Sequence, residues 1–483
     1  MQFNRLKYLG LILCFVSWTK LNAQNTFGAL NSNFTPTSSV HINPSSMLDA
    51  KTWLDINIVG IGSYTNNNLF ALENTTVIRS ISSGLPALED LHINSGSNFY
   101  HVYNRNYIQL LGAVLSQGDH AFGLSLGGYS YTTVRGIDDS LAYLMESGIN
   151  GTTIDPITQH SLRNFNVTGL AHGEIKLSYG YTFLKQRNEM FMLGLSIKKI
   201  FPLAGAALKM HQLDYNVVNE ILNMNNFQGD VMLNTSPEFS FKGGTGLDLG
   251  FTYQKMYDQC RSYYPNSKKN GCSRKLYRYK IGVSINDIGY AKFNPDNTEY
   301  YGYQESDTQY DLNRGINSAD DILNQLTGDL ENGIVKNPNK MSLPTTFSVQ
   351  VDYNILPGFL YVNGTWVQGI GPRKKAFGPR HANSISVTPR FETKWVDFAL
   401  PFSLYEYQKA QLGASIRLYI LTIGTDKLLN YFVPSNVYGS DIYMALKVPI
   451  FYNPKCKGKE KGGGMSLFGG KHKKRVAPCD AYR

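Results

Sequence analysis

Nine charged residues lie in stretches of alternating sequence that predict β-strands. In each stretch they fall on the same face as the small polar residues. They are Glu174, Lys176, Lys198, Asp248, Asp352, Arg390, Glu392, Arg417 and Lys447. Both signs are present, so opposite charges that face a shared interior would pair across it, whereas an ion-selective pore would show one dominant sign. The pattern therefore predicts ion pairs in a blocked or narrow interior. Charges that only keep an interior wet and specify the strands would produce the same pattern.

Catalytic chemistry is not indicated by a motif. The nine histidines are scattered, and none belongs to a His-Glu-x-x-His helix. His172 beside Glu174 is the nearest candidate for acid–base chemistry, and an ordinary polar position on a strand explains it equally. We predict no cofactor and no metal site, and we expect that the protein is not an enzyme.

The first 23 residues read as a secretory signal peptide. Arg5 and Lys7 precede a short apolar run at 8–18, and Ala23 offers a small residue for cleavage before Gln24. This run is shorter than the ~20 apolar residues of a membrane-spanning helix. A lipoprotein anchor is not favoured, because Cys14 lies inside the apolar run.

Four cysteines remain after cleavage, which suggests two local disulfides in an oxidising compartment. The predicted pairs are Cys260–Cys272 and Cys456–Cys479. Zinc binding is the weaker interpretation, because the spacings do not fit Cys-x-x-Cys pairs and only His472 lies near them.

The net charge of +10 belongs to the two ends of the 483-residue chain. The signal region carries +3 and the tail from Pro454 carries +7, so residues 24–453 are neutral. Nucleic acid is therefore not a predicted partner. The basic, glycine-rich tail at 454–483 is either a solvated end or a contact for anionic lipid or a partner protein. Charged residues make up 17% of the chain, below the ~25% typical of soluble domains.

Alternation of apolar and small polar residues is the strongest pattern. In residues 174–183 one face is Ile175, Leu177, Tyr179, Tyr181 and Phe183, and the other is charged, small or polar. Comparable stretches recur from 247–253 to 442–450. Successive strand residues point to opposite faces, so each stretch predicts a half-buried β-strand.

The connections between these stretches alternate in length. Tight turns at 116–119, 185–188, 356–358 and 393–394 are separated by long excursions at 65–98, 134–164, 203–242 and 295–343. Short turns at one end and long loops at the other are typical of a transmembrane barrel. The sequence predicts an all-β, antiparallel transmembrane β-barrel of about 14 strands, with short loop helices at 138–146 and 319–326.

A soluble β-sandwich would also alternate. Two observations favour the barrel: the second face is persistently small and polar, and aromatic residues gather near strand ends, where a membrane interface would lie. Examples are Tyr277 with Tyr279, and Tyr405 with Tyr407. A sheet in lipid must close, because an open edge would leave backbone groups unpaired.

Five segments resemble FadL-like fatty-acid transporters and an uncharacterised outer-membrane barrel family of Bacteroidota. They are Ile42-Asn-Pro-Ser-Ser-Met47, Gly246-Leu-Asp-Leu-Gly-Phe251, Ser284-Ile-Asn-Asp-Ile-Gly289, Leu421-Thr-Ile-Gly-Thr-Asp426 and the closing strand Asp441–Ile450. The resemblance implies a 14-stranded barrel with the mature N-terminal segment inside as a plug, and a plug motif at Asn43, Pro44 and Ser45. The transporters usually have Pro-Ala where this chain has Pro44-Ser45.

The predicted organisation is a signal peptide at 1–23, a plug at 24–50, an outer-membrane barrel at 51–453 with periplasmic termini, and a tail at 454–483. Three functions compete. The first is a passive route for small molecules, including hydrophobic ones, which predicts an apolar cavity or lateral opening near Asn43 and Pro44. The second is a structural or secretion-associated barrel that binds partner proteins through long loops and the tail. The third is an enzyme.

Overall fold

A computed structural model describes residues 26–83, 91–94, 100–142, 157–218, 221–234, 242–268, 274–311 and 334–456. The predicted signal peptide and nearly all of the basic tail therefore lie outside the described residues. Among the described residues, no helix has both the length and the apolar character needed to cross a membrane.

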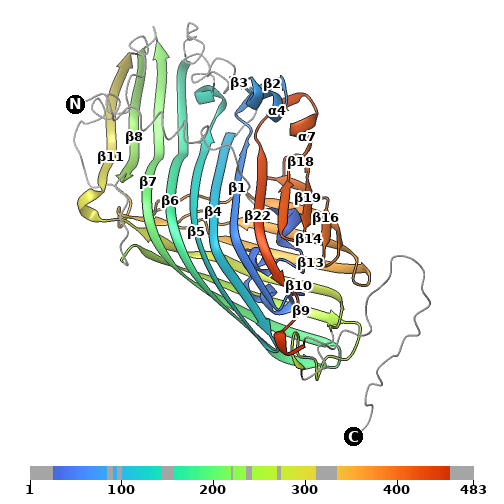
Figure 1. The fold of residues 1–483 in the computed structure, drawn as a ribbon. Helices are drawn as coiled ribbons and strands as arrows, with labels where there is room; N and C mark the ends of the chain where they lie inside the picture. The colour runs from blue at the N-terminus through green and yellow to red at the C-terminus, as the bar shows by residue number, and fades with distance from the viewer. Residues whose placement is uncertain are drawn as a thin grey trace.

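Fourteen antiparallel strand positions close into a barrel, as the sequence predicts (Figure 1). The last strand pairs with the first over Leu54↔Ile450 to Tyr64↔Asp441, so the sheet has no open seam there. In barrel order the strands are β1 (Leu54–Asn67), β4 (Tyr100–Gln117), β5 (His120–Ile137), β6 (Ile157–Gln186), β7 (Glu189–Val218), β9 (Gly244–Met256), β10 (Tyr277–Lys292), β13 (Thr346–Leu356), β14 (Leu360–Gly369), β15 (Ser384–Glu392), β16 with β17 (Val396–Ala399, Phe402–Tyr405), β18 with β19 (Lys409–Leu412, Ala414–Leu418), β20 (Leu421–Thr425) and β22 (Asp441–Ile450).

The outside of the barrel is apolar around almost its whole circumference. At least one large apolar side chain on each of thirteen strand positions is more than a third exposed: Ile58, Leu111, Phe122, Leu177, Leu193, Leu249, Ile281, Val351, Trp366, Val387, Phe402, Ile416 and Ile423. A soluble protein rarely exposes one apolar patch beyond a few hundred Å². A continuous ring of this kind is the surface of a membrane-spanning barrel.

Aromatic girdles flank this apolar belt. Near the tight turns, Trp395 lies 4.9 Å from Tyr419 between ring centroids. Near the long loops, the indole N–H of Trp366 donates to the Tyr407 hydroxyl at 2.9 Å. Tryptophan and tyrosine favour the membrane interface, because one end of the ring is apolar and the other is polar.

A charge placed in this belt should cost stability according to its depth. We expect Leu193→Arg, well inside the belt, to lower the free energy of unfolding by about 2–4 kcal/mol. The matched control is Ile355→Arg, which lies next to a tight turn and should cost only about 0–1 kcal/mol. Guanidinium unfolding of the barrel in phosphatidylcholine vesicles measures both. Equal effects would contradict a membrane boundary at the tight turns.

Beyond the barrel, the sheet continues into a tall extension, which we call the wing. β6 and β7 are each 30 residues long, whereas a membrane crossing needs about 9–11. The outer half of β7 pairs with β8 (Ile221–Asn234), and β8 pairs with β11 (Glu299–Asp311). The expectation of loops at 203–242 and around 134–164 is therefore wrong over most of their described residues, which form the strands at the upper left of Figure 1.

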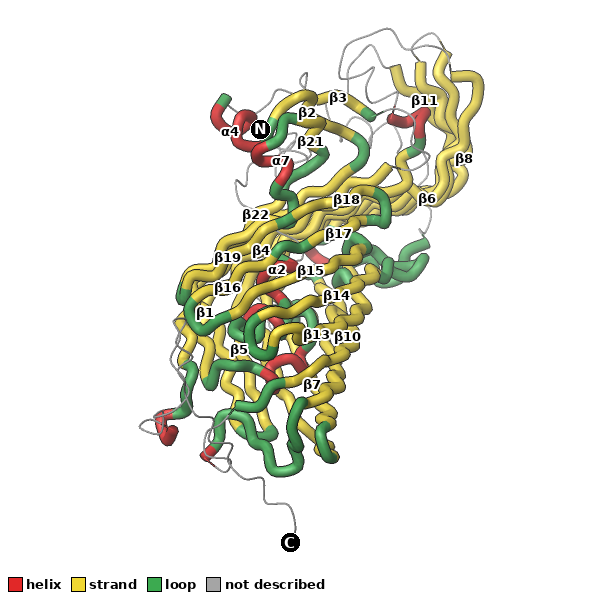
Figure 2. The backbone as a smooth tube through the Cα atoms, turned by 90° about the vertical axis from the view of Figure 1, so that its right-hand side faces the viewer, coloured by secondary structure: helices red, strands yellow, loops and turns green. Residues whose placement is uncertain are grey.

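A small cap stands at the same end, over β22 (Figures 1 and 2). It consists of a three-stranded sheet, β2 (Phe70–Thr75), β3 (Leu91–Ile93) and β21 (Ser435–Val437), with two helices, α4 (Val77–Ser82) and α7 (Leu429–Phe432). The predicted helix at 138–146 is observed at 139–142, where the Asp138 carboxylate accepts from the Leu141 amide. The predicted helix at 319–326 lies outside the described residues.

Residues 26–53 form a plug inside the barrel. Its helices are α2 (Phe27–Leu30), α3 (Pro36–Ser39) and the 3₁₀ helix η1 (Pro44–Asp49), drawn in red within the yellow tube of Figure 2. Pro36 and Pro44 begin α3 and η1, where the missing N–H costs nothing. The Asn43 side chain caps η1 by accepting from the Ser45 amide.

The long connection 257–276 packs at the tight-turn end, where the Gly118 amide donates to the Pro265 carbonyl. Cys260 in this connection is a free, buried thiol, so the predicted Cys260–Cys272 disulfide is wrong. Its Sγ donates to the Glu189 carbonyl at 3.2 Å, and its side chain packs with Met190, Met256 and Tyr263. Cys272 and Cys479 lie outside the described residues, so the pair Cys456–Cys479 remains a prediction.

Candidate functional site: a filled lumen and a break in the wall

The motif Asn43-Pro44-Ser45 packs directly against glycines of the barrel wall. A Cβ added to Gly194 on β7 would lie 2.2 Å from the Ser45 nitrogen, and one added to Gly250 on β9 would lie 2.2 Å from Asn43 Oδ1. These two glycines are direct cross-strand partners. The wall therefore lacks side chains at the point where the plug backbone touches it.

Gly194→Ala should unseat the plug, because its methyl group would meet plug backbone that cannot rotate away. Overpacking of this kind typically costs about 1–3 kcal/mol. We expect faster protease cleavage within residues 26–50 of the folded barrel. The control is Gly364→Ala, whose added Cβ meets only the Val351 carbonyl at 4.0 Å. If protease cleaved the plug equally slowly in both variants, the contact at Gly194 would not be what holds the plug in place.

Side-chain hydrogen bonds also hold this motif to the neighbouring wall strands β9 and β13. The Asn43 amide nitrogen lies 3.0 Å from Gln350 Oε1 and 3.3 Å from Thr252 Oγ1. The hydroxyls of Ser45 and Thr252 are 2.7 Å apart. All of these groups are buried, so losing a partner would leave a polar atom unsatisfied.

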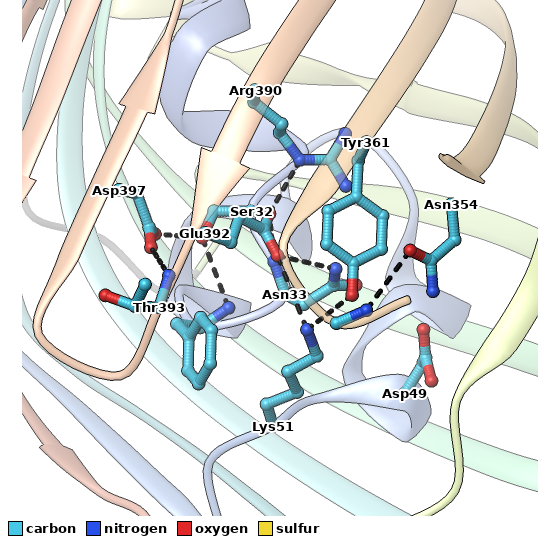
Figure 3. A network of polar contacts seen from close by, with 12 residues as sticks. Ser32, Asn33, Asp49, Lys51, Asn354, Tyr361, Arg390, Glu392, Thr393 and Asp397 are labelled. Carbon is cyan, nitrogen blue, oxygen red and sulfur yellow. Dashed lines mark hydrogen bonds and ion pairs between the residues drawn. The ribbon is translucent and has the colours of Figure 1, made fainter. Parts of the chain in front are cut away.

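Arg390 centres a buried ion cluster (Figure 3). Its guanidinium binds Asp352 with two hydrogen bonds, of 2.8 and 2.7 Å, and Glu392 with one of 2.6 Å. Glu392 also accepts from the Asn33 side-chain amide of the plug at 2.8 Å and lies 3.6 Å from the Lys51 ammonium. The cluster therefore joins the wall strands β13 and β15 to the plug.

Lys198 centres a second cluster, on wall strands β6, β7, β9 and β10. Its ammonium lies 2.9 Å from Asp248 and 2.5 Å from Asp287, and Lys176 lies 3.1 Å from Asp248. The plug residue His41 contacts Lys176 at 3.2 Å. Burial, reinforced by Lys176 and Lys198, holds the pKa of His41 well below its ordinary value. The imidazole is therefore neutral and adds no cation beside the two lysines.

The structure places all nine predicted charges in the interior and buries each of them. Glu174 lies 4.0 Å from Lys198, Arg417 binds Asp397, and Lys447 donates to the plug Ser38. The prediction that these charges pair across a blocked or narrow interior needs correction. Because the plug occupies the centre, the charges pair along the wall or with the plug.

Two small cavities lie beside the plug. One of about 40 Å³ lies between the plug and β9, β10, β13 and β14. Another of about 80 Å³ lies on the long-loop side, where Arg105 stacks within 5.8 Å of Tyr107, Tyr129 and Tyr131. An engineered cavity that binds benzene measures about 150 Å³. Neither space would hold even a small aromatic ring without movement.

The wall itself is interrupted between β1 and β4. Pairing runs through Asn57↔Gly112 and resumes at Gly60↔Gln109, with no pairs between. β1 bulges against β22 and β4 bulges against β5 at the same level. The residues in the break face outward: Ile58, Leu110 and Leu111 are 52%, 48% and 59% exposed.

The inner side of this break touches the plug. The Asn57 side-chain amide donates to the Leu110 carbonyl at 3.0 Å, which satisfies part of the interrupted ladder. Gln109 Nε2 lies 2.9 Å from the His41 ring and 3.4 Å from the Thr37 carbonyl. The break is therefore lined by lipid-facing aliphatic groups outside and closed inside by two amides and the plug.

Comparison with known sequences places the chain in a family. Residues 44–426, from the plug motif to the end of β20, match the model of the family of unknown function DUF5723. The chain belongs to this family. None of the curated proteins matches it.

The solved structures that are similar to this DUF5723 barrel share little sequence with it. A mutant of the TodX monoaromatic hydrocarbon channel is 10% identical, with a TM-score of 0.35, over 86% of this chain and 94% of that one. A Pseudomonas aeruginosa FadL homologue is 7% identical, with a TM-score of 0.25, over 90% and 99%. Because these scores are low, the assignment of fold rests on the strand pairing, and nothing about function follows from them.

Catalysis finds little support in the described residues of the DUF5723 barrel. His172 stacks on Tyr129 and Tyr131, while Glu174 faces Lys198, so they form no acid–base pair. The stretch 123–127 reads Gly-x-Ser-x-Gly, a match that motif reading missed. It lies in the middle of strand β5 and not on the strand-to-helix turn that exposes a nucleophile.

One contact in the wing resembles a hydrolase triad. His160 lies 2.6 Å from Asp138 and 3.2 Å from the Ser140 hydroxyl. Asp138 also caps the helical turn at 139–142, and neither of the two plug cavities adjoins the group. The contact is explained by its structural role in holding this turn against β6.

Proposed function

We propose that this protein is an outer-membrane barrel, closed along its axis, that lets small apolar molecules pass through the side of its wall. The tight turns and both ends of the mature chain would face the periplasm, and the wing and cap would face outward. The predicted signal peptide and the apolar belt support this location.

The observation that carries the proposal is the break between β1 and β4. A regular ladder seals a barrel wall with backbone hydrogen bonds, and here two residues on each strand make no such pairs. The break opens outward onto aliphatic side chains, so an apolar molecule dissolved in lipid could reach it without crossing water.

The filled lumen argues against passage along the axis. Buried contacts join the plug to the wall: Asn33 and Lys51 bind Glu392, and His41 contacts Lys176. The two cavities beside the plug are smaller than a benzene site. Passage through the break would require a smaller movement, of the Gln109 side chain and the plug segment that carries His41.

Uptake by proteoliposomes tests the proposal. Purified barrel in phosphatidylcholine vesicles should admit a small apolar dye faster than protein-free vesicles do. It should not admit hydrophilic sugars, as judged by vesicle swelling. Sugar permeation would show an axial pore, and dye uptake equal to the protein-free rate would overturn the proposal.

A non-transporting scaffold is the second candidate, because the wing reaches far beyond a membrane crossing. It would bind partner proteins through the wing, the loops and the basic tail. This candidate predicts no dye uptake, together with a co-purifying protein that is lost when residues 454–483 are deleted. Co-purification unaffected by the deletion would contradict a role for the tail.

A further inference from the structure

Helix α7 turns its polar side chains inward and exposes its apolar ones, which is the reverse of a helix that faces water. Its polar side chains point inward: Asn430 donates to the Gly439 carbonyl at 2.8 Å, and Tyr431 to the Asp441 carbonyl at 2.9 Å. Its apolar side chains point outward, with Leu429, Phe432 and Val433 exposed by 49%, 69% and 49%. A helix on a water-facing surface shows the opposite arrangement.

Helix α4 of the cap packs against α7 and enlarges this surface (Figure 1). Ile78 and Ile81 are exposed by 49% and 54%, and the basic Arg79 between them is also exposed. We call these five side chains, Ile78, Ile81, Leu429, Phe432 and Val433, the α4–α7 patch. Such a group of large apolar residues marks a surface that binds something apolar.

The α4–α7 patch begins beside the lipid-facing belt. The Leu428 amide, one residue before α7, donates to the Leu412 carbonyl of β18 at 2.7 Å. Leu412 pairs with Phe402, an outward belt residue. Farther along the same segment, Tyr438 lies 3.8 Å from the Lys409 ammonium, next to the girdle residue Tyr407. α7 therefore starts beside the lipid-facing belt, at the level of Phe402, and the segment that follows it reaches the level of Tyr407.

The segment is also held rigidly in this place. The buried Lys427 donates to the Thr65 carbonyl at 2.8 Å and to Asn66 at 2.9 Å, and so ties the start of α7 to β1. Asp426 accepts from the Tyr405 hydroxyl at 3.1 Å. The exposure of Phe432 is thus a property of the folded chain.

We infer that the α4–α7 patch is seated in the lipid leaflet at the long-loop end, at the boundary of headgroups and acyl chains. Its continuity with the belt identifies lipid as the occupant. Amphipathic helices commonly lie with their apolar face about 5–10 Å into this boundary. Arg79 and Lys409 flank the patch, where long basic side chains can reach headgroup phosphates. The cap would then be anchored to the membrane independently of any transport.

Fluorescence quenching tests the inference. Phe432→Trp is reconstituted in phosphatidylcholine vesicles with and without brominated acyl chains, and the wild-type spectrum is subtracted. We expect bromolipid to quench this tryptophan strongly, and aqueous acrylamide to quench it weakly. Unheated electrophoretic mobility confirms that each variant is folded.

The matched control is Glu73→Trp, on strand β2 of the same cap, where the glutamate side chain is 53% exposed. It should show strong acrylamide quenching and no bromolipid quenching. Because the vesicles contain no other protein, a patch meant for a protein partner would be open to water. A Phe432→Trp signal that behaves like the Glu73→Trp signal would overturn the inference.

Discussion

Arg390→Met should be among the most damaging single substitutions in this barrel. It would leave Asp352 and Glu392, both buried, without the guanidinium that binds them. Removing one partner of a buried ion pair typically costs about 3–5 kcal/mol, because the remaining charge stays desolvated. We expect a lower midpoint of guanidinium unfolding and faster cleavage of the plug by protease.

Two controls separate charge from packing. Lys255→Met removes a partly exposed pair, in which Lys255 lies 2.7 Å from Glu189, and should change the midpoint little. The double variant Arg390→Met, Asp352→Asn removes one charge of each sign, keeps the Lys51–Glu392 pair and should recover much of the loss. An Arg390→Met barrel as stable as the wild type would show that the cluster does not hold the plug.

Deleting residues 26–50 should convert a closed barrel into a water-filled pore. Eight-stranded barrels are filled by their own side chains and barrels of 16–18 strands leave a channel, so a 14-stranded wall without its plug should leave an opening. The exposed wall would carry both signs of charge and should select ions weakly. Planar-bilayer conductance and sugar-driven vesicle swelling should both rise from the protein-free level to that of an open porin.

The matched control for this deletion is the chain that lacks residues 457–483, which should remain closed to ions and sugars. A plug-deleted barrel that folds, as judged by unheated electrophoretic mobility, yet conducts no ions would contradict the conclusion that residues 26–50 close the lumen.

Most of the barrel was predictable because each strand carries its own signal. Alternation as in 174–183 depends only on one face meeting lipid and the other meeting the interior. The wing was not predicted, because its strands face neither lipid nor a plug, and runs such as Ala204–Ala207 do not alternate. The number of barrel strands could still be predicted, because it depends only on the membrane-spanning segments, which do alternate.

The site was only partly predictable. Short-range patterns located the interior charges, and the resemblance located Asn43-Pro44-Ser45, but neither showed which charges pair. The break in the wall depends on two strands about fifty residues apart. The sequence does contain a local sign of this break. Ile58-Val59 and Leu110-Leu111 each place two aliphatic residues in succession where a regular alternation would have one. The predicted Cys260–Cys272 disulfide was wrong because closeness in sequence does not show how a side chain packs. Cys260 is buried in a cluster with Tyr263 and Tyr277.

A reversible crosslink across the break tests the lateral route most directly. Regular pairing would set Ile58 opposite Leu111, so cysteines at these two positions could join β1 to β4 when oxidised. The matched crosslink joins Ile61 to Ile108, which are paired partners on the same two strands away from the break. Wild-type barrel treated identically accounts for its own cysteines.

Apolar dye uptake by proteoliposomes is then measured before oxidation, after oxidation and after reduction. The proposed route predicts that the 58–111 crosslink abolishes uptake and that reduction restores it, while the 61–108 crosslink leaves uptake unchanged. Uptake that persists with the 58–111 crosslink fully formed would contradict passage through the wall.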